Sequence, residues 1–418
     1  MPDDGRRPVE SLVARRRPGY SLEAPFYTDA TIFARDLDII FGRHWIYVAV
    51  EPDVPEPGDC ITVDIGGNSV LIVRDDDMRV KAFHNVCRHR GARLVHDPKT
   101  TVGNIVCRYH QWTYGLDGTL LYADHMAPDF ERACHGLKPV HIRSLAGLLF
   151  ICLAATPPDD FGDMAALLTP YIAPHDVPNT KVVHSTELVE AGNWKLTMEN
   201  NRECYHCSVS HPELNHSLFA EGFGFSPSAD NAALRGQTER YASLVGTMQS
   251  GWESGGYASR EIERLAGRPT AFRVERLPLD GAGESETLDT KIACRKLLGN
   301  INDPKLGGLS VWTQPNSWHH FMSDHIVTFS AIPVDPRHTL LRTKWLVHKD
   351  AVEGEDYDIA NLTAVWEATN RQDSELVGYV QAGVSSAAYE PGPYSTFTEG
   401  LVEKFCAWYI ERLAANAD

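Results

Sequence analysis

Cys87-Arg88-His89 and, after 17 intervening residues, Cys107-Arg108-Tyr109-His110 are the two stretches that decide how this 418-residue chain is organised. Together they offer two cysteine thiolates and two histidine imidazoles from a pair of short loops. Thiolates are soft metal ligands and imidazoles are borderline ones. A mixed set at this spacing therefore predicts a metal site.

A Rieske-type [2Fe–2S] cluster needs such a mixed set, because two thiolates hold one iron and two imidazoles hold the other. The flanking residues Arg90-Gly91 and Gln111-Trp112-Thr113-Tyr114 also fit such loops. A structural zinc ion would use the same four atoms tetrahedrally, so spacing alone leaves zinc open. A second metal motif downstream favours the cluster, and the predicted cluster ligands are Cys87, His89, Cys107 and His110.

The second motif is Glu203-Cys204-Tyr205-His206-Cys207-Ser208-Val209-Ser210-His211. Its two histidines are five residues apart, about one and a half helical turns, so they face one metal only if the helix bends or loosens between them. Two histidines and a distant carboxylate form the facial triad of non-haem Fe(II) oxygenases, which leaves positions open for dioxygen. A histidine pair alone is weak evidence, but downstream of the first motif it indicates a mononuclear iron site.

With these residues the chain resembles the oxygenase (α) component of the Rieske non-haem iron oxygenases, over nearly its full length. The segment from Asn193-Trp194-Lys195 to Glu203-x-x-His206-x4-His211-Pro212 matches the family's iron-binding segment. Two positions depart from the family's second cluster loop: Arg108 replaces a proline and Gln111 replaces a glycine. Neither residue carries a ligand atom, so we expect the cluster to form. We expect the two changes to affect the reduction potential of the cluster or the rigidity of the loop.

The resemblance implies an α+β fold. It consists of a small all-β Rieske domain and an α+β catalytic domain of the helix-grip (START-like) type with a central antiparallel sheet. We expect residues 1–43 to form an amino-terminal arm and lead-in, residues 44–155 the Rieske domain, and residues 156–418 the catalytic mononuclear iron domain. Pro157-Pro158-Asp159-Asp160 marks the boundary between the last two.

The resemblance also points to a third iron ligand. The family places an acidic residue eight positions before a glutamine, and Asp373 stands at that distance from Gln381. Glu375 is the competing candidate on the same predicted helix. We therefore expect Asp373 to complete the iron site with the two histidines.

Glu203 has an expected role in electron transfer. Members of the family are usually trimers, in which the cluster of one subunit lies beside the iron of the next. A carboxylate can accept a hydrogen bond from a ring N–H of two imidazoles. By resemblance, Glu203 would join His206 to His110 of the neighbouring subunit, so a homotrimer is expected and a monomer should be inactive.

The glutamate at position 203, where ring-hydroxylating members carry an aspartate, resembles the branch that oxidises N-methyl groups of quaternary ammonium compounds. This implies a monooxygenase that uses O2 to demethylate a small betaine, first glycine betaine, giving dimethylglycine and formaldehyde. Proline betaine (stachydrine) and carnitine are the alternatives. An aromatic ring-hydroxylating dioxygenase is disfavoured by Glu203, and a purely electron-transferring Rieske protein by the second motif.

A permanent cation without N–H donors cannot be held by hydrogen bonds, and a cage of aromatic rings suits it. The stretch from Val311 to Phe321 is our first candidate for such a cage. His319 and His320 in this stretch are interpreted as core or pocket residues rather than further iron ligands. The predicted substrate-binding residues are Trp312, Trp318 and Phe321.

The composition and the motifs of the chain restrict the classes of partner that it can have. The net charge of −17, from 39 basic and 56 acidic residues, argues against nucleic acid and suits a cationic substrate. No run of 18 apolar residues is present to span a membrane, and no apolar stretch follows the amino-terminal arginines as in a secretory signal. No Gly-x-Gly-x-x-Gly follows a predicted strand, so we expect electrons to come from a separate NAD(P)H-dependent reductase of the flavin or ferredoxin type.

The nine cysteines are odd in number and scattered, so they do not form a disulfide framework. This favours the reducing cytoplasm, which iron–sulfur assembly needs. The pair Cys204-x-x-Cys207 suggests a redox motif, but we interpret both residues as packing positions among the iron ligands.

Alternating apolar residues and turn signals predict strands at 61–65, 69–74, 148–153, 325–332 and 339–348. Amphipathic patterns predict helices at 33–43 and 395–415. The segment 222–283, rich in glycine, serine and alanine, predicts a loop-rich insertion over the active site.

Overall fold

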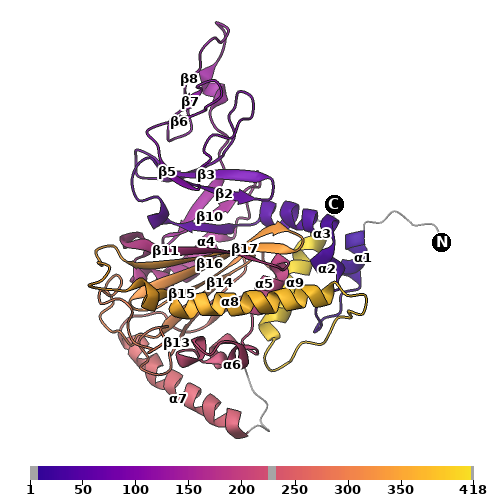
Figure 1. Ribbon diagram of the computed structural model, residues 1–418, viewed down its shortest axis with the longest axis vertical. Helices are drawn as coiled ribbons and strands as arrows, with labels where there is room; N and C mark the ends of the chain where they lie inside the picture. Colours follow the sequence, from indigo (N-terminus) through magenta and orange to yellow (C-terminus); the bar gives the residue numbers. More distant parts are fainter. Residues whose placement is uncertain (1–7, 225–231, 416–418) are drawn as a thin grey trace, which may run out of the picture.

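The structure is a computed structural model that describes residues 8–224 and 232–415. A small β domain projects from a larger body in which helices pack on a wide sheet (Figure 1). No helix in these two ranges is both long enough and apolar enough to span a lipid bilayer.

The small domain contains three sheets, with strand orders β1-β10-β9, β4-β3-β2-β5 and β6-β7-β8. In the hairpin β2–β3, Ile65 pairs with Asn68 across a two-residue turn, and Gly66 adopts the left-handed φ of 57° that this turn requires. The sheet β6-β7-β8 lies at the outer tip (Figure 1). The strands are β1 (Ile46–Val50), β2 (Asp59–Ile65), β3 (Asn68–Arg74), β4 (Val80–His84), β5 (Lys99–Thr101), β6 (Ile105–Val106), β7 (Thr113–Tyr114), β8 (Leu120–Tyr122), β9 (His141–Leu145) and β10 (Leu148–Cys152).

The body is built on a seven-stranded antiparallel sheet of order β11-β17-β16-β15-β14-β13-β12. Its central strands are buried on both faces, because helices and the small domain cover them. These strands are β11 (Thr180–Glu190), β12 (Ile262–Arg264), β13 (Phe272–Leu277), β14 (Gly308–Thr313), β15 (Ser317–Phe321), β16 (His325–Asp335) and β17 (His338–His348).

Two helices near the second motif, α5 and α8, pack against this sheet. Helix α5 contacts β16, β17 and helix α8, and α8 also contacts β11. The helices are α1 (Pro8–Ala14), α2 (Pro25–Thr28), α3 (Ala30–Arg35), α4 (Phe161–Ile172), α5 (Trp194–Asn201), α6 (Cys207–Ser210), α7 (Ala232–Ser254), α8 (Ile359–Val384) and α9 (Gly400–Ala415).

A buried polar cluster fastens the amino-terminal segment to this body. The carboxylate of Asp36, which is fully buried, pairs with Lys195 and accepts hydrogen bonds from Trp194 Nε1 (2.9 Å) and the Tyr409 hydroxyl (2.6 Å). These partners lie on α5 and α9, so one carboxylate ties three segments together. Breaking a buried pair of this kind leaves an uncompensated charge and costs several kcal/mol, on the order of 3–5.

The expected strands are confirmed within a few residues, and three expectations about helices need correction. The expected helix 33–43 is α3 followed by a π-helical turn, Asp36–Phe41. The last helix begins at Gly400 rather than at residue 395. The segment 222–283 is not loop-rich: outside residues 225–231, which lie beyond the described ranges, it contains the 23-residue helix α7 and strands β12 and β13.

Candidate metal centres and active-site cavity

The two cysteine–histidine loops lie in the outer part of the small domain, and each is closed by the same pair of backbone hydrogen bonds. Cys87 N–H donates to the Ala92 carbonyl at 2.7 Å, and Cys87 O accepts from Gly91 N–H at 3.0 Å. The second loop repeats both bonds around Cys107, at 2.8 and 3.0 Å. Each cysteine is thus fixed at the base of a tight turn.

The four predicted cluster ligands are brought together with the thiols inside and the imidazoles outside. Cys87 and Cys107 are 3% and 1% exposed, whereas His89 and His110 are exposed and their ring centroids are 4.6 Å apart. The ring of Trp112 stacks on His89 at 4.9 Å and orients it. Two buried thiols and two exposed imidazoles offer the two kinds of ligand that a Rieske cluster would need, a cysteine pair for one iron and a histidine pair for the other.

The departure at Gln111 has a structural cost. Gln111 has a φ of 58°, in the left-handed region, whereas the equivalent position in the first loop is Gly91, with a φ of 75°. A side chain other than glycine is strained there by about 1–2 kcal/mol. Arg108 is exposed and has no such strain.

Helix α5 positions the second motif. The Asn193 side chain caps it by accepting from Lys195 N–H at 3.1 Å. Gln381 on α8, the glutamine eight positions after Asp373, accepts a hydrogen bond from Asn193 N–H at 2.8 Å. This bond connects α8 to the start of α5. The two helices that lead to the iron motif are therefore held in a fixed relation.

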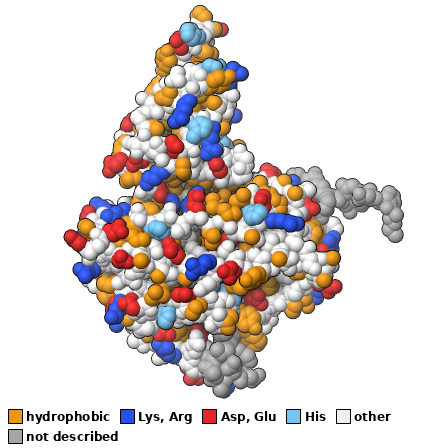
Figure 2. Space-filling view, viewed as in Figure 1, with side chains coloured by type: hydrophobic (Ala, Val, Ile, Leu, Met, Phe, Trp, Pro, Cys, Tyr) orange, Lys and Arg blue, Asp and Glu red, His pale blue; other side chains and the backbone are white. Residues whose placement is uncertain are grey.

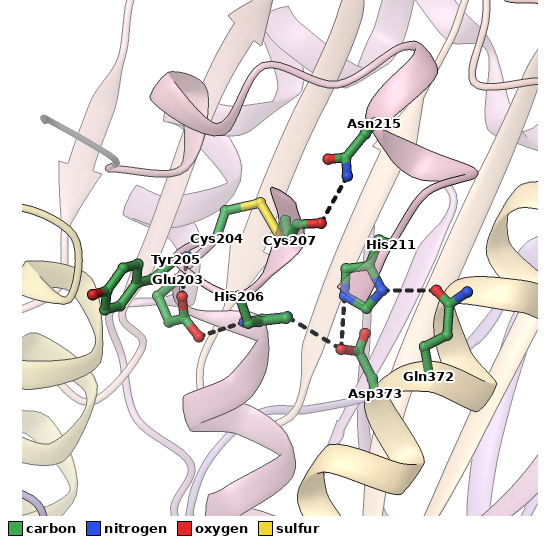
Figure 3. Close-up of a disulfide and its surroundings, with 9 residues drawn as sticks. All are labelled: Glu203, Cys204, Tyr205, His206, Cys207, His211, Asn215, Gln372 and Asp373. Atoms are coloured by element: carbon green, nitrogen blue, oxygen red, sulfur yellow. Dashed lines mark hydrogen bonds and ion pairs between the residues drawn. A yellow bond between two sulfur atoms is a disulfide. The ribbon is translucent and has the colours of Figure 1, made fainter. Parts of the chain in front are cut away.

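His206 and His211 stand at the two ends of α6, a helix of a single turn. This satisfies the expectation that the helix must loosen between them. His206 Nε2 lies 3.2 Å and His211 Nε2 3.0 Å from Asp373 Oδ1, a carboxylate oxygen that arrives from α8 (Figure 3). That oxygen is buried and has no hydrogen bond of acceptable geometry within the described residues. Three converging ligand atoms with an unsatisfied oxygen fit a metal ion of the facial-triad kind.

The Nδ1 atoms of His206 and His211, which point away from Asp373, also have side-chain partners. His206 Nδ1 lies 2.5 Å from Glu203 Oε1, and His211 Nδ1 lies 2.8 Å from Gln372 Oε1 (Figure 3). Such second contacts fix the ring orientation of metal-binding histidines. Burial lowers the pKa of His206, but the carboxylates of Asp373 and Glu203 outweigh burial and raise it to about 10. A metal ion at this site must displace that proton.

Gln372 is a residue that the sequence analysis missed, although it adjoins the expected ligand. Its amide nitrogen donates to Glu213 Oε2 at 2.8 Å, which turns its oxygen toward His211. Glu375, the competing ligand candidate, is exposed on the outside of α8. The structure thus brings Asp373, and not Glu375, to the histidines.

Cys204 and Cys207 are joined by a disulfide, so their interpretation as separate packing positions is wrong (Figure 3). Both are buried, and the bond spans His206. Cys207 Sγ lies within 4.8 Å of ligand atoms of His206 and His211, but as a disulfide sulfur it offers no thiolate to a metal. Asp373 remains the better third ligand.

An inner cavity lies at the three converging residues, with about 360 Å³ of free space when the part open to solvent is counted. Phe223, His320 from β15 and Trp366 from α8 also line it. The His320 and Trp366 ring centroids are 4.4 Å apart. A concave site that combines aromatic side chains with convergent polar groups is typical of small-molecule binding.

The aromatic residues expected to form the cage do not line this cavity. Phe321 faces the opposite side of the sheet, because side chains alternate along β15, and it contacts His175 there at 5.3 Å. Trp318 is stacked on Phe329 at 5.1 Å beneath the cavity. The face of Trp312 is occupied by the guanidinium groups of Arg202 and Arg273, at 4.8 and 5.2 Å.

A second, outer groove of about 780 Å³ shares three residues with the inner cavity, Asn200, Glu203 and His206. These three residues therefore stand in the wall between them. The groove is bordered by the exposed side chains of Tyr379 and Val380, and Tyr205 beside Glu203 is also exposed. Exposed apolar side chains grouped in this way are typical of a protein-binding surface.

Comparison with protein families matches two parts of the chain. Residues 44–142 match the Rieske [2Fe-2S] domain. Residues 177–415, more than half of the chain, match the ring hydroxylating alpha subunit (catalytic domain). The two matches contain the first and the second metal motif respectively.

Among curated proteins, the glycine betaine monooxygenase oxygenase subunit of Pseudomonas aeruginosa (strain UCBPP-PA14) is 42% identical over 421 residues, covering 99% of this chain and 94% of the relative. The carnitine monooxygenase oxygenase subunit of Acinetobacter baumannii is 32% identical over 215 residues, covering 50% and 57%. Among solved structures, the quaternary ammonium Rieske monooxygenase CntA in complex with L-carnitine has a TM-score of 0.67 at 21% identity, covering 96% of this chain and 98% of that chain. The last similarity establishes the fold.

Proposed function

This chain belongs to the ring-hydroxylating α-subunit family of the Rieske oxygenases, and from that premise we propose that it removes one methyl group from glycine betaine. The reaction consumes glycine betaine, O2, two electrons and two protons, and yields dimethylglycine, formaldehyde and water. The observation that carries the proposal is a cavity lined both by His206, His211 and Asp373 and by the aromatic rings of Phe223 and Trp366. The full-length similarity to a relative named for this substrate supports it.

The cofactors are a Rieske [2Fe–2S] cluster and a mononuclear Fe(II). Cys87, His89, Cys107 and His110 would hold the cluster, and His206, His211 and Asp373 would hold the iron. When bound, the cluster supplies electrons and the iron supplies the site at which dioxygen is activated. The chain's own part is to place one N-methyl group beside that site and to keep water away from it.

Phe223 and Trp366 suit a quaternary ammonium group in this cavity. Their π faces attract a cation that has no N–H to donate. Removing one methyl gives an amine that carries an N–H when protonated, and an unpaired buried donor costs about 1–3 kcal/mol. The product should therefore bind more weakly than the substrate and leave.

Glu203 is proposed to connect two subunits. Its Oε1 contacts His206, and its side chain is 13% exposed in the wall between cavity and groove. A homotrimer that seats His110 of a neighbouring copy in the outer groove would place Glu203 between the two imidazoles. The exposed side chains around the groove support such an assembly, as do those of Leu121 and Tyr122 in β8, which lies in the outer part of the small domain (Figure 1). Hydrophobic side chains are visible at the tip of this domain (Figure 2).

The oxygenase works with a reductase and a quaternary ammonium substrate. We further propose that this reductase is a separate NAD(P)H-dependent protein of the flavin or ferredoxin type and that the system is cytoplasmic. Acidic and basic side chains are mixed on the face shown in Figure 2, and the net charge is −17. This pattern supports neither nucleic acid nor a membrane surface as a partner.

The test is a substrate panel. Purified protein with both metal sites filled is incubated with a surrogate ferredoxin reductase and glycine betaine, proline betaine, carnitine, choline or benzoate. Formaldehyde equal to the oxygen consumed is expected with glycine betaine. Coupled oxygen uptake with benzoate and none with any betaine would defeat the proposal, whereas a preference for proline betaine or carnitine would keep the chemistry and change the substrate.

A further inference from the structure

A buried carboxylate lies behind the aromatic side of the inner cavity. Glu286, between β13 and β14, is 2% exposed. Its Oε1 accepts from His320 Nδ1 at 3.1 Å, and its Oε2 accepts from Trp366 Nε1 at 2.8 Å. One carboxylate thus fixes two cavity-lining side chains that come from β15 and α8.

Glu286 is ionised. Burial raises the pKa of its carboxyl, but the charge of His320 and the hydrogen bonds from His320 and Trp366 outweigh burial, so the pKa lies below its ordinary value. The carboxylate thus gives one ring nitrogen of His320 a negatively charged hydrogen-bond partner inside the protein, while the ring itself lines the cavity.

His320 also has a ring nitrogen to spare. Within the described residues, Nε2 makes no hydrogen bond, although Nδ1 is held by Glu286. The ring lines the inner cavity and an adjoining cavity of about 280 Å³, which also share Leu218 and Phe223. His320 Nε2 can therefore contact the end of a bound ligand that points away from His206, His211 and Asp373.

The linings contain no fixed positive charge for an anion. No lysine or arginine is among the described residues that line either cavity, and Glu203, Asp373 and Glu286 are all acidic. His206 and His211 belong to the metal site, and the remaining polar side chains of the two linings are Asn200, Asn201, Thr369, Ser310 and His320. A zwitterionic substrate with a carboxylate needs a hydrogen-bond donor here, because an unpaired buried charge is costly.

We propose that His320, held by Glu286, binds the carboxylate of the betaine, while Trp366, held by the same Glu286, faces its trimethylammonium group. This rests on the proposed function. The two rings are adjacent, with centroids 4.4 Å apart, so a short ligand such as glycine betaine, whose cation and carboxylate are separated by one methylene, can contact both. His320 is then a specificity-determining residue, and Glu286 is a positioning residue.

The experiment compares ligands that share the trimethylammonium group but differ in the carboxylate. Binding of glycine betaine and choline to the metal-loaded protein is measured by anaerobic titration calorimetry, and kcat and KM are measured from formaldehyde release. His320→Gln should weaken glycine betaine binding about 10- to 100-fold, the range of a charge-assisted hydrogen bond, and change choline binding less than about threefold. Glu286→Gln should raise KM for glycine betaine about three- to tenfold, with a much smaller change in kcat, because its effect acts through His320.

The matched control is His319→Gln, the same substitution at the neighbouring position, which faces the other side of the sheet and lines neither cavity. It should leave both affinities unchanged. If H320Q loses iron or acid-labile sulfide, Glu286→Gln is judged by the same glycine betaine to choline ratio.

The outcomes separate this inference from the proposed function. Suppose that the wild-type protein demethylates glycine betaine, but H320Q leaves the ratio of glycine betaine to choline affinity unchanged or weakens both ligands equally. That result overturns the role of His320 and leaves the proposed function standing. Failure of the wild type to bind or demethylate any betaine overturns the proposed function and this inference together.

Discussion

Asp373 is the single residue on which the two histidines of the iron motif converge, at 3.2 and 3.0 Å. Asp373→Ala should lower iron content at least tenfold and leave the cluster in place, because removing a ligand costs more than the 10- to 100-fold seen for supporting contacts. Iron and acid-labile sulfide are measured on the same sample. Glu375→Ala, two residues further along α8, is the matched control and should keep its iron.

If the Glu375 variant loses iron and the Asp373 variant retains it, the assignment of the third ligand is reversed.

Glu203 contacts His206 from the solvent side of the wall between cavity and groove. Glutamine keeps the size of the side chain but loses its charge, so Glu203→Gln should retain both metals and lower turnover by about 100-fold or more, a loss of about 3 kcal/mol. Stopped-flow absorbance of the cluster gives the rate of its oxidation in a single turnover. Glu399→Gln, on the border of the same groove, should behave like the wild type.

A wild-type rate of cluster oxidation in the Glu203 variant would remove Glu203 from the electron path.

The residues that sequence could assign are those whose chemistry lies in short motifs. Cys87 to His110 and His206 to His211 were predicted from spacing and side-chain type, and Asp373 from a family pattern. The pairing of His320 with Glu286 could not be predicted, because the two residues are 34 positions apart in the sequence, with strand β14 between them, and meet only in the folded chain. Choosing among aromatic residues also requires knowing which face of β15 points toward the iron motif.

At the scale of elements, the loop that carries Cys107 and His110 contains the strained Gln111. Gln111→Gly should stabilise the loop by about 0.5–1 kcal/mol, since glycine adopts a φ of 58° without steric cost while losing somewhat more entropy on folding. Thermal bleaching of the cluster's visible absorption should shift upward by about 2 °C. Arg108→Gly, in the same loop but without a positive φ, should shift it downward.

Equal shifts for the two glycine variants would show that the backbone conformation at position 111 is not the cause.

The strands were easier to predict than the helices. Alternating patterns placed β2, β3, β16 and β17 within three residues at each end. Helix α7 was missed because Gly236, Gly246 and Gly251 within it have low intrinsic helix propensity. The disulfide was missed because its two cysteines flank a metal ligand, where sequence gives no reason to prefer a bond over two thiols.

At the scale of the whole molecule, the cluster loops and the iron motif of one chain lie far apart, with β6–β8 at the tip and α6 at the other end of the body (Figure 1). Electron transfer between subunits predicts that two inactive variants can restore activity together. His110→Ala and Asp373→Ala are coexpressed with different tags, and mixed trimers are isolated through both tags. In a cyclic trimer of two kinds of subunit, one of the three directed contacts joins an intact cluster to an intact iron site, so about a third of wild-type activity is expected.

Each variant alone, assembled to the same size, serves as the control and should be inactive. No recovery in the mixed trimers would mean that electrons pass within one chain.

The distance between the cluster loops and the iron motif within one chain also matters before the subunits assemble. A newly made copy can fill both metal sites and still keep its stored electron away from the metal that binds oxygen. Under the proposed transfer of electrons between subunits, assembly rather than metal loading would be the step that makes the enzyme active. Unassembled copies would then avoid the release of superoxide and peroxide that would follow if one chain joined the two centres by itself.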